Sequence, residues 1–229
     1  MSQNLLKRII TSIFLLSLLL FIIFSHKNVF IISILIIGLI ICIEANNLFS
    51  KLLNNNRSKK NFSINKFNIK FSLLNIITFC YVFFILCNLS LEIFRSEGEI
   101  FFLYLISICF FTDIGGYLFG KIFGGKKLSK ISPNKTISGT IGSFILSIIP
   151  LIIVLNFNYI ELEFNLKNII FCLLISLISQ LGDLIISFIK RKAKVKDSGN
   201  LLPGHGGILD RVDGIIFAVP FSYILLKLL

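Results

Sequence analysis

The 229-residue sequence has few acidic residues, only two histidines and four prolines, and no tryptophan. Its aromatic residues are mostly phenylalanine and do not alternate with basic residues, so it offers no base-stacking surface for nucleic acid. Its five cysteines lie in apolar runs without a CxxC pair or a neighbouring histidine, which argues against a disulfide framework and a zinc site. Only 15% of the residues are charged, against about a quarter in soluble domains. A soluble globular domain is therefore excluded.

Long apolar runs make up most of the chain, and 55% of all residues are hydrophobic. A bilayer needs about 20 consecutive apolar residues for each helical span. Seven runs have about this length, near residues 5–24, 29–49, 71–91, 100–120, 140–157, 168–189 and 212–229. Backbone groups in hydrocarbon must pair internally, and these runs lack the alternation of barrel strands. We predict an all-α, polytopic transmembrane helical bundle of about seven spans, forming a single integral membrane domain over residues 1–229.

The basic residues favour one orientation in the membrane. If the N-terminus is cytoplasmic, almost every lysine and arginine falls in an inner segment. The exceptions are Lys27, Arg95, Lys167 and Lys227. Basic residues are retained on the cytoplasmic side, so we place the N-terminus inside and the C-terminus outside. The same topology accounts for the net charge of +12 without a nucleic-acid partner.

Polar residues concentrate in two segments that this topology places at the cytoplasmic face, residues 113–142 and 180–213. Apart from Glu44, every acidic residue outside the outer segments lies in one of them. An aspartate at the centre of a membrane helix costs about 2.5–3.5 kcal/mol on insertion scales, so such residues are functional candidates. Glu44, at the inner end of the second run, is expected to serve helix packing, with support of a site as the alternative.

The second segment combines carboxylates with basic side chains. Asp183 and Ser187 are four residues apart and should share a helix face, and Asp210 and Asp213, three apart, should share a face of the last helix. Such oxygen donors suit Mg²⁺. Six basic residues surround them: Lys190, Arg191, Lys192, Lys194, Lys196 and Arg211. Carboxylates beside a dense cationic field suit a nucleoside triphosphate and a second phosphate substrate.

Glycines in both segments could let backbone amides approach a phosphate. They include Gly204, Gly206 and Gly207 in the second segment, and Gly115, Gly116, Gly124 and Gly125 in the first. The alternative for such a loop is a flexible connection between helices. His205 could donate a hydrogen bond to phosphate or shuttle a proton. Its alternative is a solvent-exposed loop residue.

The motif in the second segment has three parts. It reads Ser187-Phe-Ile-Lys190-Arg191, then Lys196-Asp197-Ser198-Gly199, then LPGHGGILDRVD from Leu202 to Asp213. This motif resembles the signature of the phosphatidate cytidylyltransferases, also called CDP-diacylglycerol synthases. The first segment is similar to the upstream region of that family at Asp113, Gly116-Tyr117, Gly120, Gly124, Ser132-Pro133 and Lys135-Thr136. The resemblance covers approximately residues 100–229, which we expect to be the catalytic half.

The resemblance implies an enzyme that transfers the cytidylyl group of CTP to phosphatidate in phospholipid biosynthesis. It further implies Mg²⁺ with K⁺ as a candidate second ion, a homodimer, and a bacterial inner-membrane location with a cytoplasmic active site. The implied metal ligands are Asp183, Ser187, Asp210 and Asp213. The implied phosphate-binding residues are Lys190, Arg191, Lys196, His205 and Arg211, with the loop glycines Gly204, Gly206 and Gly207. Asp113 and Lys135 would serve the nucleotide.

One departure from the family and two other functions bear on this prediction. The family commonly has Trp-Glu after the Lys-Thr pair, whereas this chain has Ile137-Ser138. A CTP-dependent lipid-alcohol kinase, which transfers the γ-phosphate, is the closest alternative function. A transporter is less favoured, because the acidic residues gather at one membrane face and no broken helices repeat in two halves.

Overall fold

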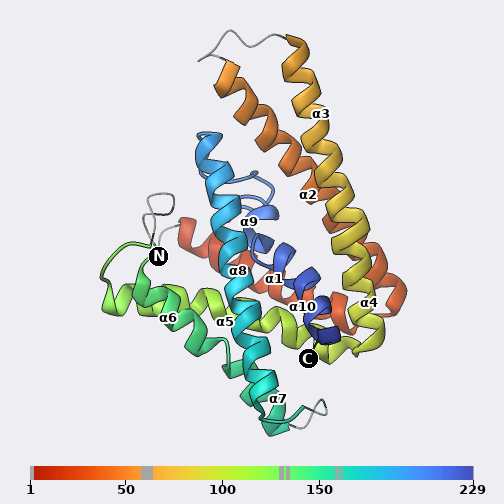
Figure 1. The fold of residues 1–229 in the computed structure, drawn as a ribbon, viewed down its shortest axis with the longest axis vertical. Helices are drawn as coiled ribbons and strands as arrows, with labels where there is room; N and C mark the ends of the chain where they lie inside the picture. The colour runs from red at the N-terminus through yellow and green to blue at the C-terminus, as the bar shows by residue number, and fades with distance from the viewer. Residues whose placement is uncertain are drawn as a thin grey trace. The chain divides into compact units, whose positions relative to one another are not determined.

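The computed structural model describes residues 3–57, 64–128, 132, 135–157, 160 and 162–228. Its elements are α1 (Gln3–Phe24), α2 (Lys27–Arg57), α3 (Ile64–Cys80), the π-helix η1 (Tyr81–Cys87), α4 (Asn88–Ser96), α5 (Gly98–Phe123), α6 (Ile137–Leu146), α7 (Ile149–Phe157), α8 (Leu166–Lys192), α9 (Leu209–Val212) and α10 (Ile215–Leu228) (Figure 1). In these residues extended pairing is limited to two isolated bridges, Lys127–Thr136 and Leu202–Gly206. The all-α prediction is confirmed. Pro133 lies outside the described residues.

Six stretches of the described chain are long and apolar enough to cross a membrane. They are Lys7–Phe24, Lys27–Asn54, Asn68–Ser96, Gly98–Phe123, Ile137–Phe157 and Leu166–Lys192. Each matches one of the predicted runs, and the seventh run corresponds to α10, a helix of 14 residues. The polytopic class is therefore confirmed, while the number of spans and the orientation stay predictions.

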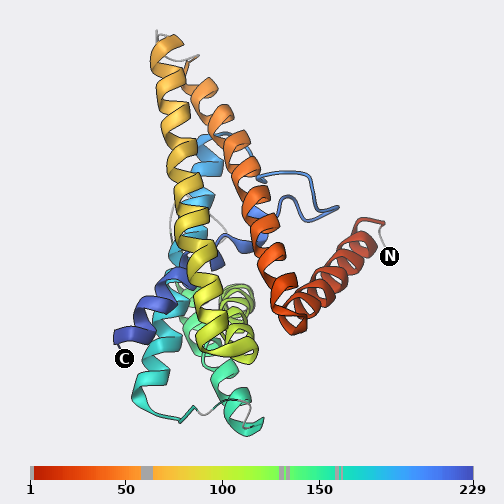
Figure 2. The same cartoon turned by 90° about the vertical axis from the view of Figure 1, so that its right-hand side faces the viewer.

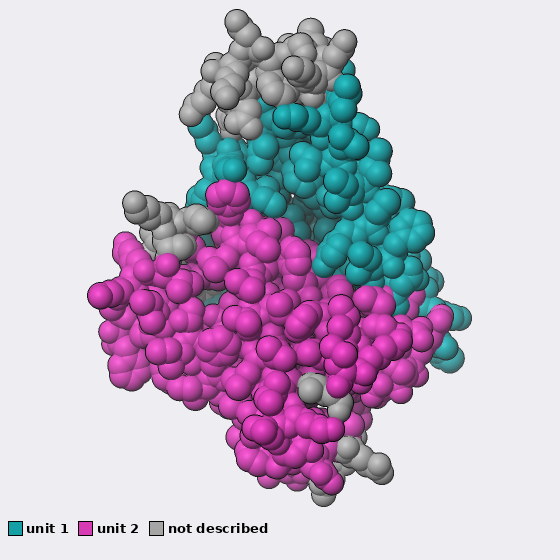
Figure 3. Space-filling model, viewed as in Figure 1, with its two compact units in different colours: residues 1–88, 189–212 teal, residues 89–188, 213–229 magenta. Residues whose placement is uncertain are grey.

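The chain forms two compact units, coloured separately in Figure 3. Unit 1 comprises residues 1–88 and 189–212, and unit 2 comprises residues 89–188 and 213–229. Helix α8 belongs to unit 2 over most of its length and enters unit 1 in its last turn. The prediction of a single membrane domain over the whole chain stays a prediction.

Unit 1 contains the pair α2 and α3, which lie along each other in both ribbon views (Figures 1 and 2). The side-chain amide of Asn75 donates to Asn46 Oδ1 at 3.2 Å across this pair. Helix α1 meets α2 at their connecting turn and then diverges from it (Figure 2). Its side chains Ile13, Phe14 and Phe21 are exposed, as expected for a helix that faces lipid.

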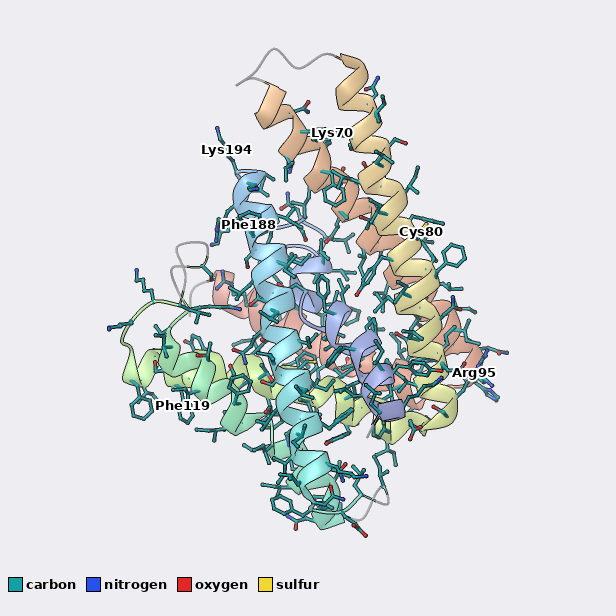
Figure 4. All side chains as sticks on the ribbon, in the orientation of Figure 1. Lys70, Cys80, Arg95, Phe119, Phe188 and Lys194 are labelled. Atoms are coloured by element: carbon teal, nitrogen blue, oxygen red, sulfur yellow. The ribbon has the colours of Figure 1, made fainter. Side chains whose placement is uncertain are left out.

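Unit 2 is organised around a close approach of α5 and α6. A Cβ atom on Gly116 would lie 2.9 Å from Ser143 Oγ, and one on Gly139 would lie 2.7 Å from Gly116 O. The side chain of Phe119, labelled in Figure 4, occupies the space beside Gly142. Small residues allow helix backbones in membranes to pack this closely.

The glycines of α5 therefore have a packing role. Gly115 and Gly116 lie inside α5, with their amides within the helix, and face α6. The expectation that they offer amides to a phosphate is wrong, because neither lies in a loop. Gly124 and Gly125 do follow the helix, with φ angles of 57° and 101° that favour glycine.

Helix α8 packs on α5 through aromatic contacts and on the segment before α10 through glycines. Tyr104 stacks on Phe171 with ring centroids 6.5 Å apart. A Cβ atom on Gly182 would lie 2.9 Å from Asp213 O, and one on Gly214 would lie 2.9 Å from Ser179 O. The Asp213–Gly214 turn is therefore pressed against α8 beside Gly182, the residue before Asp183.

Candidate active site

The first group of predicted site residues lies in unit 2 and joins the two polar segments. Lys135 Nζ forms an ion pair with Asp183 Oδ2. Ser187 Oγ donates a hydrogen bond to Asp183 Oδ1 at 3.1 Å, as their spacing of four residues on one helix predicts. The side chains of Lys135 and Asp183 are 28% and 24% exposed, so the pair is not enclosed by the protein. The structure thus brings a predicted nucleotide-binding lysine to a predicted metal ligand.

Local structure fixes Lys135 just before α6. Its carbonyl accepts a hydrogen bond from Leu128 N at 2.8 Å, which pairs it with the segment that follows α5. The next residue, Thr136, is the N-cap of α6, and its hydroxyl accepts a hydrogen bond from Gly139 N at 3.1 Å. Such a cap satisfies a free amide of the first helical turn. Lys135 is therefore held from both sides.

Ser138, one of the two residues that depart from the family pattern, has a structural role here. Ser138 Oγ donates to the carbonyl of Gly124 and also contacts Thr136 Oγ1 at 3.0 Å. This bond ties the start of α6 to the turn that ends α5. Ile137 is exposed.

Asp113 and Asp213 belong to the same unit. Asp113 is exposed on α5, and its role toward the nucleotide stays a prediction. Asp213 Oδ1 accepts a hydrogen bond from Gly214 N at 2.9 Å, within the turn between α9 and α10. The expectation that Asp210 and Asp213 share one face of the last helix is wrong, because α9 ends at Val212 and α10 begins after the turn.

The second group lies in unit 1 and centres on Asp210. Lys190 Nζ donates to Asp210 Oδ1 at 2.7 Å. Asp210 Oδ2 accepts from Ser198 N at 2.7 Å, from Ser198 Oγ at 3.0 Å and from Gly207 N at 3.0 Å. The side chains of Lys190 and Asp210 are only 11% and 5% exposed. Burial raises the pKa of Asp210, but the hydrogen bonds from Lys190, Gly207 and Ser198 outweigh it and hold that pKa below its ordinary value.

Glu44 completes this group from α2. Its side chain is buried, at 4% exposure. It accepts hydrogen bonds from Ser198 Oγ at 2.7 Å, from Ile208 N at 3.0 Å and from Leu209 N at 2.9 Å. The packing role expected from the sequence is wrong, because these bonds go to the signature motif. We call Glu44, Lys190, Ser198, Gly207 and Asp210 the clasp, and residues 198–209 the signature loop.

The glycines of the signature loop have two structural functions. A Cβ atom on Gly199 would lie 2.8 Å from Glu44 Oε1, and one on Gly207 would overlap Glu44 Oε2 and Ser198 Oγ. These two glycines make room for the Glu44 carboxyl group. Gly204 and Gly206 have φ angles of 77° and 84°, which favour glycine in the turn. The amide of Gly207, expected to face a phosphate, donates to Asp210 in this structure.

His205 lies at the turn of the signature loop and contacts α1. Thr11 Oγ1 is 2.6 Å from its Nδ1, and Ser12 Oγ is 3.3 Å from its Nε2. Its carbonyl accepts hydrogen bonds from Arg211 Nη2 at 2.7 Å and Nε at 3.2 Å. Partial burial, followed by the positive charges of Arg211 and Arg8, holds the pKa of His205 below its ordinary value. The imidazole is therefore neutral at physiological pH.

The remaining predicted phosphate-binding residues, Arg191 and Lys196, are exposed to solvent. Within the described residues, His, Cys, Asp and Glu side chains do not form a group of three that could hold a metal ion. Unit 2 contains three of the four predicted metal ligands, namely Asp183, Ser187 and Asp213. Asp210 belongs to the clasp in unit 1.

Comparison with known proteins places the chain in a family. Residues 48–229, most of its length, match the model of the cytidylyltransferase family. The chain belongs to the cytidylyltransferase family. The resemblance found in the sequence is confirmed, and the matched region contains both groups of site residues except Glu44.

Curated relatives from staphylococci give a more specific comparison. Phosphatidate cytidylyltransferases of Staphylococcus haemolyticus and Staphylococcus aureus strain COL are 46% and 49% identical to the chain over 136 residues. The enzyme of the same name from Staphylococcus saprophyticus is 44% identical over 137 residues. Each alignment covers 58% of this chain and 51% of the relative. The chain thus spans about half the length of the curated relatives it matches.

Proposed function

We propose that the chain transfers the cytidylyl group of CTP to phosphatidate, giving CDP-diacylglycerol and pyrophosphate. The observation that carries this proposal is the ion pair between Lys135 and Asp183, which joins the two motif segments at a partly exposed place in unit 2. Family membership and the names of the staphylococcal relatives support the same reaction. We also propose a bacterial inner-membrane location with the site at the cytoplasmic face, because the basic segments favour that side.

The proposed reaction makes and breaks one bond at the α-phosphorus of CTP. A phosphate oxygen of phosphatidate attacks that phosphorus in line, and the bond to the bridging oxygen of the leaving pyrophosphate breaks. Such a transfer depends on positioning and on compensation of charge. Lys135 would bind the nucleotide phosphates, while the exposed Arg191 and Lys196 would attract the two anionic substrates. No covalent enzyme intermediate is required.

Magnesium is proposed as the cofactor, with three oxygen donors of unit 2 as its candidate ligands, although both oxygens of Asp183 are engaged by Lys135 and Ser187 in this structure. Asp183, Ser187 and Asp213 supply carboxylate and hydroxyl oxygens, and Mg²⁺ typically takes one or two carboxylates together with water and substrate phosphates. When bound, Mg²⁺ would neutralise part of the phosphate charge. Potassium, also expected from the resemblance, would take the same kind of donor. Asp210 as a further ligand stays a prediction, since its oxygens accept hydrogen bonds from the clasp.

A homodimer is proposed from the family resemblance alone. Chemical cross-linking in native membranes, followed by the mass of the purified detergent complex, would test it. A single-chain mass in both measurements would contradict the proposal.

One radiolabel experiment separates this function from its alternatives. The purified protein is incubated with phosphatidate vesicles, Mg²⁺ and CTP labelled at the α-phosphate, and the lipid and water phases are separated. Label in the lipid supports cytidylyl transfer. In a parallel incubation with a lipid alcohol, label recovered as CDP indicates a kinase. If CTP is unchanged in both incubations, the transporter is the function that remains. The Asp183→Asn protein serves as the matched inactive control.

A further inference from the structure

Glu44 is a buried carboxyl group that has no role in the proposed reaction. It lies on α2, more than 150 residues before its partners, yet all three of its hydrogen bonds go to the signature loop. The bonds reach both ends of that loop, at Ser198 and at the amides of Ile208 and Leu209. A buried carboxyl group that bridges both ends of a loop restricts the conformations the loop can adopt.

Ser198 connects Glu44 to the rest of the clasp. Its hydroxyl oxygen lies 2.7 Å from Glu44 Oε2 and 3.0 Å from Asp210 Oδ2. A hydroxyl has a single proton and can donate to only one carboxyl group at a time. The positions of Glu44 and Asp210 are therefore coupled through Ser198, and Asp210 in turn binds Lys190.

The signature loop has glycines at the positions that face the Glu44 carboxyl group. Gly199 and Gly207 lack side chains where the carboxyl group lies, and a Cβ atom on Gly207 would overlap it. Both oxygens are used, because Oε1 accepts from Ile208 and Oε2 accepts from Leu209 and Ser198. A glutamine would turn its NH₂ group toward one of these donors. An aspartate would be one methylene too short to keep all three bonds.

We infer that Glu44 is a positioning residue for cytidylyl transfer, an inference that rests on the proposed function. It does not touch substrate, because it is 4% exposed and its oxygens are occupied by protein donors. It acts through the signature loop, which carries His205 and whose Ser198 and Gly207 amides bind Asp210, the partner of Lys190. The residue lies outside the motif that defines the family signature, but it holds that motif in shape.

The test compares Glu44→Gln with Glu163→Gln, an exposed residue that undergoes the same change of charge. We expect Glu44→Gln to lower kcat per folded enzyme by about a hundredfold at saturating CTP and phosphatidate, since small misplacements have effects of this size. Glu163→Gln should stay within about twofold of wild type. Hydrogen exchange of peptides covering residues 198–209 should be about tenfold faster in Glu44→Gln, because hydrogen bonds to charged groups are lost there.

Each outcome decides the inference. Faster exchange confined to the signature loop, together with the loss of kcat, supports it. Unchanged loop exchange, an increase throughout the chain, or an equal loss of kcat in Glu163→Gln overturns it. If Glu44→Gln does not fold, Ser198→Ala, which removes one of the three bonds, is measured in the same two assays. If the wild-type protein leaves no label in lipid, the proposed function fails, and loop exchange alone decides whether Glu44 holds the loop.

Discussion

The ion pair between Lys190 and Asp210 can be tested by replacing the carboxylate with an amide. In Asp210→Asn the lysine keeps its charge but loses its ion pair with Asp210, in a place where the two side chains are 11% and 5% exposed. Removing one partner of a buried ion pair typically costs about 3–5 kcal/mol, because the remaining charge is left buried and unpaired. The signature loop should therefore open far more often than in the wild type.

The size of this effect follows from the conversion between free energy and equilibrium. Since about 1.4 kcal/mol corresponds to a factor of ten, a loss of 3–5 kcal/mol raises the opening equilibrium of the loop roughly a hundred- to several-thousandfold. Hydrogen exchange measures this directly at the amides of Ser198 and Gly207, which donate to Asp210 in the wild type. Peptides from α5, remote from the clasp in the chain, should exchange at unchanged rates.

Two further variants make the experiment decisive. Asp197→Asn changes the same charge at an exposed neighbouring residue and should leave loop exchange close to wild type. The double variant Lys190→Met/Asp210→Asn removes both charges and should recover part of the lost protection, because no unpaired charge remains. Equal exchange in Asp210→Asn and Asp197→Asn would refute the reasoning, and so would a double variant that opens more than Asp210→Asn.

Three other predictions concern single residues of the two groups. Asp183→Asn should abolish label transfer to lipid while the protein still inserts in the membrane, because it removes the partner of Lys135; near-normal turnover would exclude Asp183 from the site. Gly207→Ala should open the signature loop, since the new methyl group overlaps both Glu44 Oε2 and Ser198 Oγ; hydrogen exchange of the loop at the wild-type rate would contradict the steric argument. The lowered pKa of His205 means that the folded protein binds fewer protons there than the unfolded chain, so protection of the loop should fall as pH drops below the ordinary value of 6.5. His205→Ala should lose this pH dependence and also lower turnover, and protection that stays flat in the wild type would contradict the assignment.

The helices could be predicted because the bilayer leaves few alternatives. Each long apolar run had to be helical, and the spacing of Asp183 and Ser187 then implied the hydrogen bond found between them. The same reasoning failed for Asp210 and Asp213, because a turn at Asp213–Gly214 separates α9 from α10. Spacing predicts a shared face only while the helix is continuous.

Contacts between distant parts of the chain could not be predicted from local patterns. Nothing near Lys135 in sequence indicates that it pairs with Asp183, and nothing near Glu44 indicates that it binds Ser198. The one local signal at Glu44 was a single carboxyl group at the end of an apolar run, which also fits helix packing. Burying a carboxyl group without hydrogen bonds costs free energy, so Glu44 needed a partner. Which residue that partner is depended on the fold.

The glycines of the signature show how one pattern can have two explanations. Flexibility toward a phosphate and room for a buried carboxyl group both require a residue without a side chain. The structure assigns the second explanation to Gly199 and Gly207, because the oxygens of Glu44 lie where their Cβ atoms would be. A loop shaped by two buried carboxyl groups before substrate arrives has less conformational entropy to lose on binding. Two basic residues bonded to the loop or to the clasp, Arg211 at the His205 carbonyl and Lys190 at Asp210, are then held in place as the reacting charge develops, which is the condition under which electrostatic stabilisation is most effective.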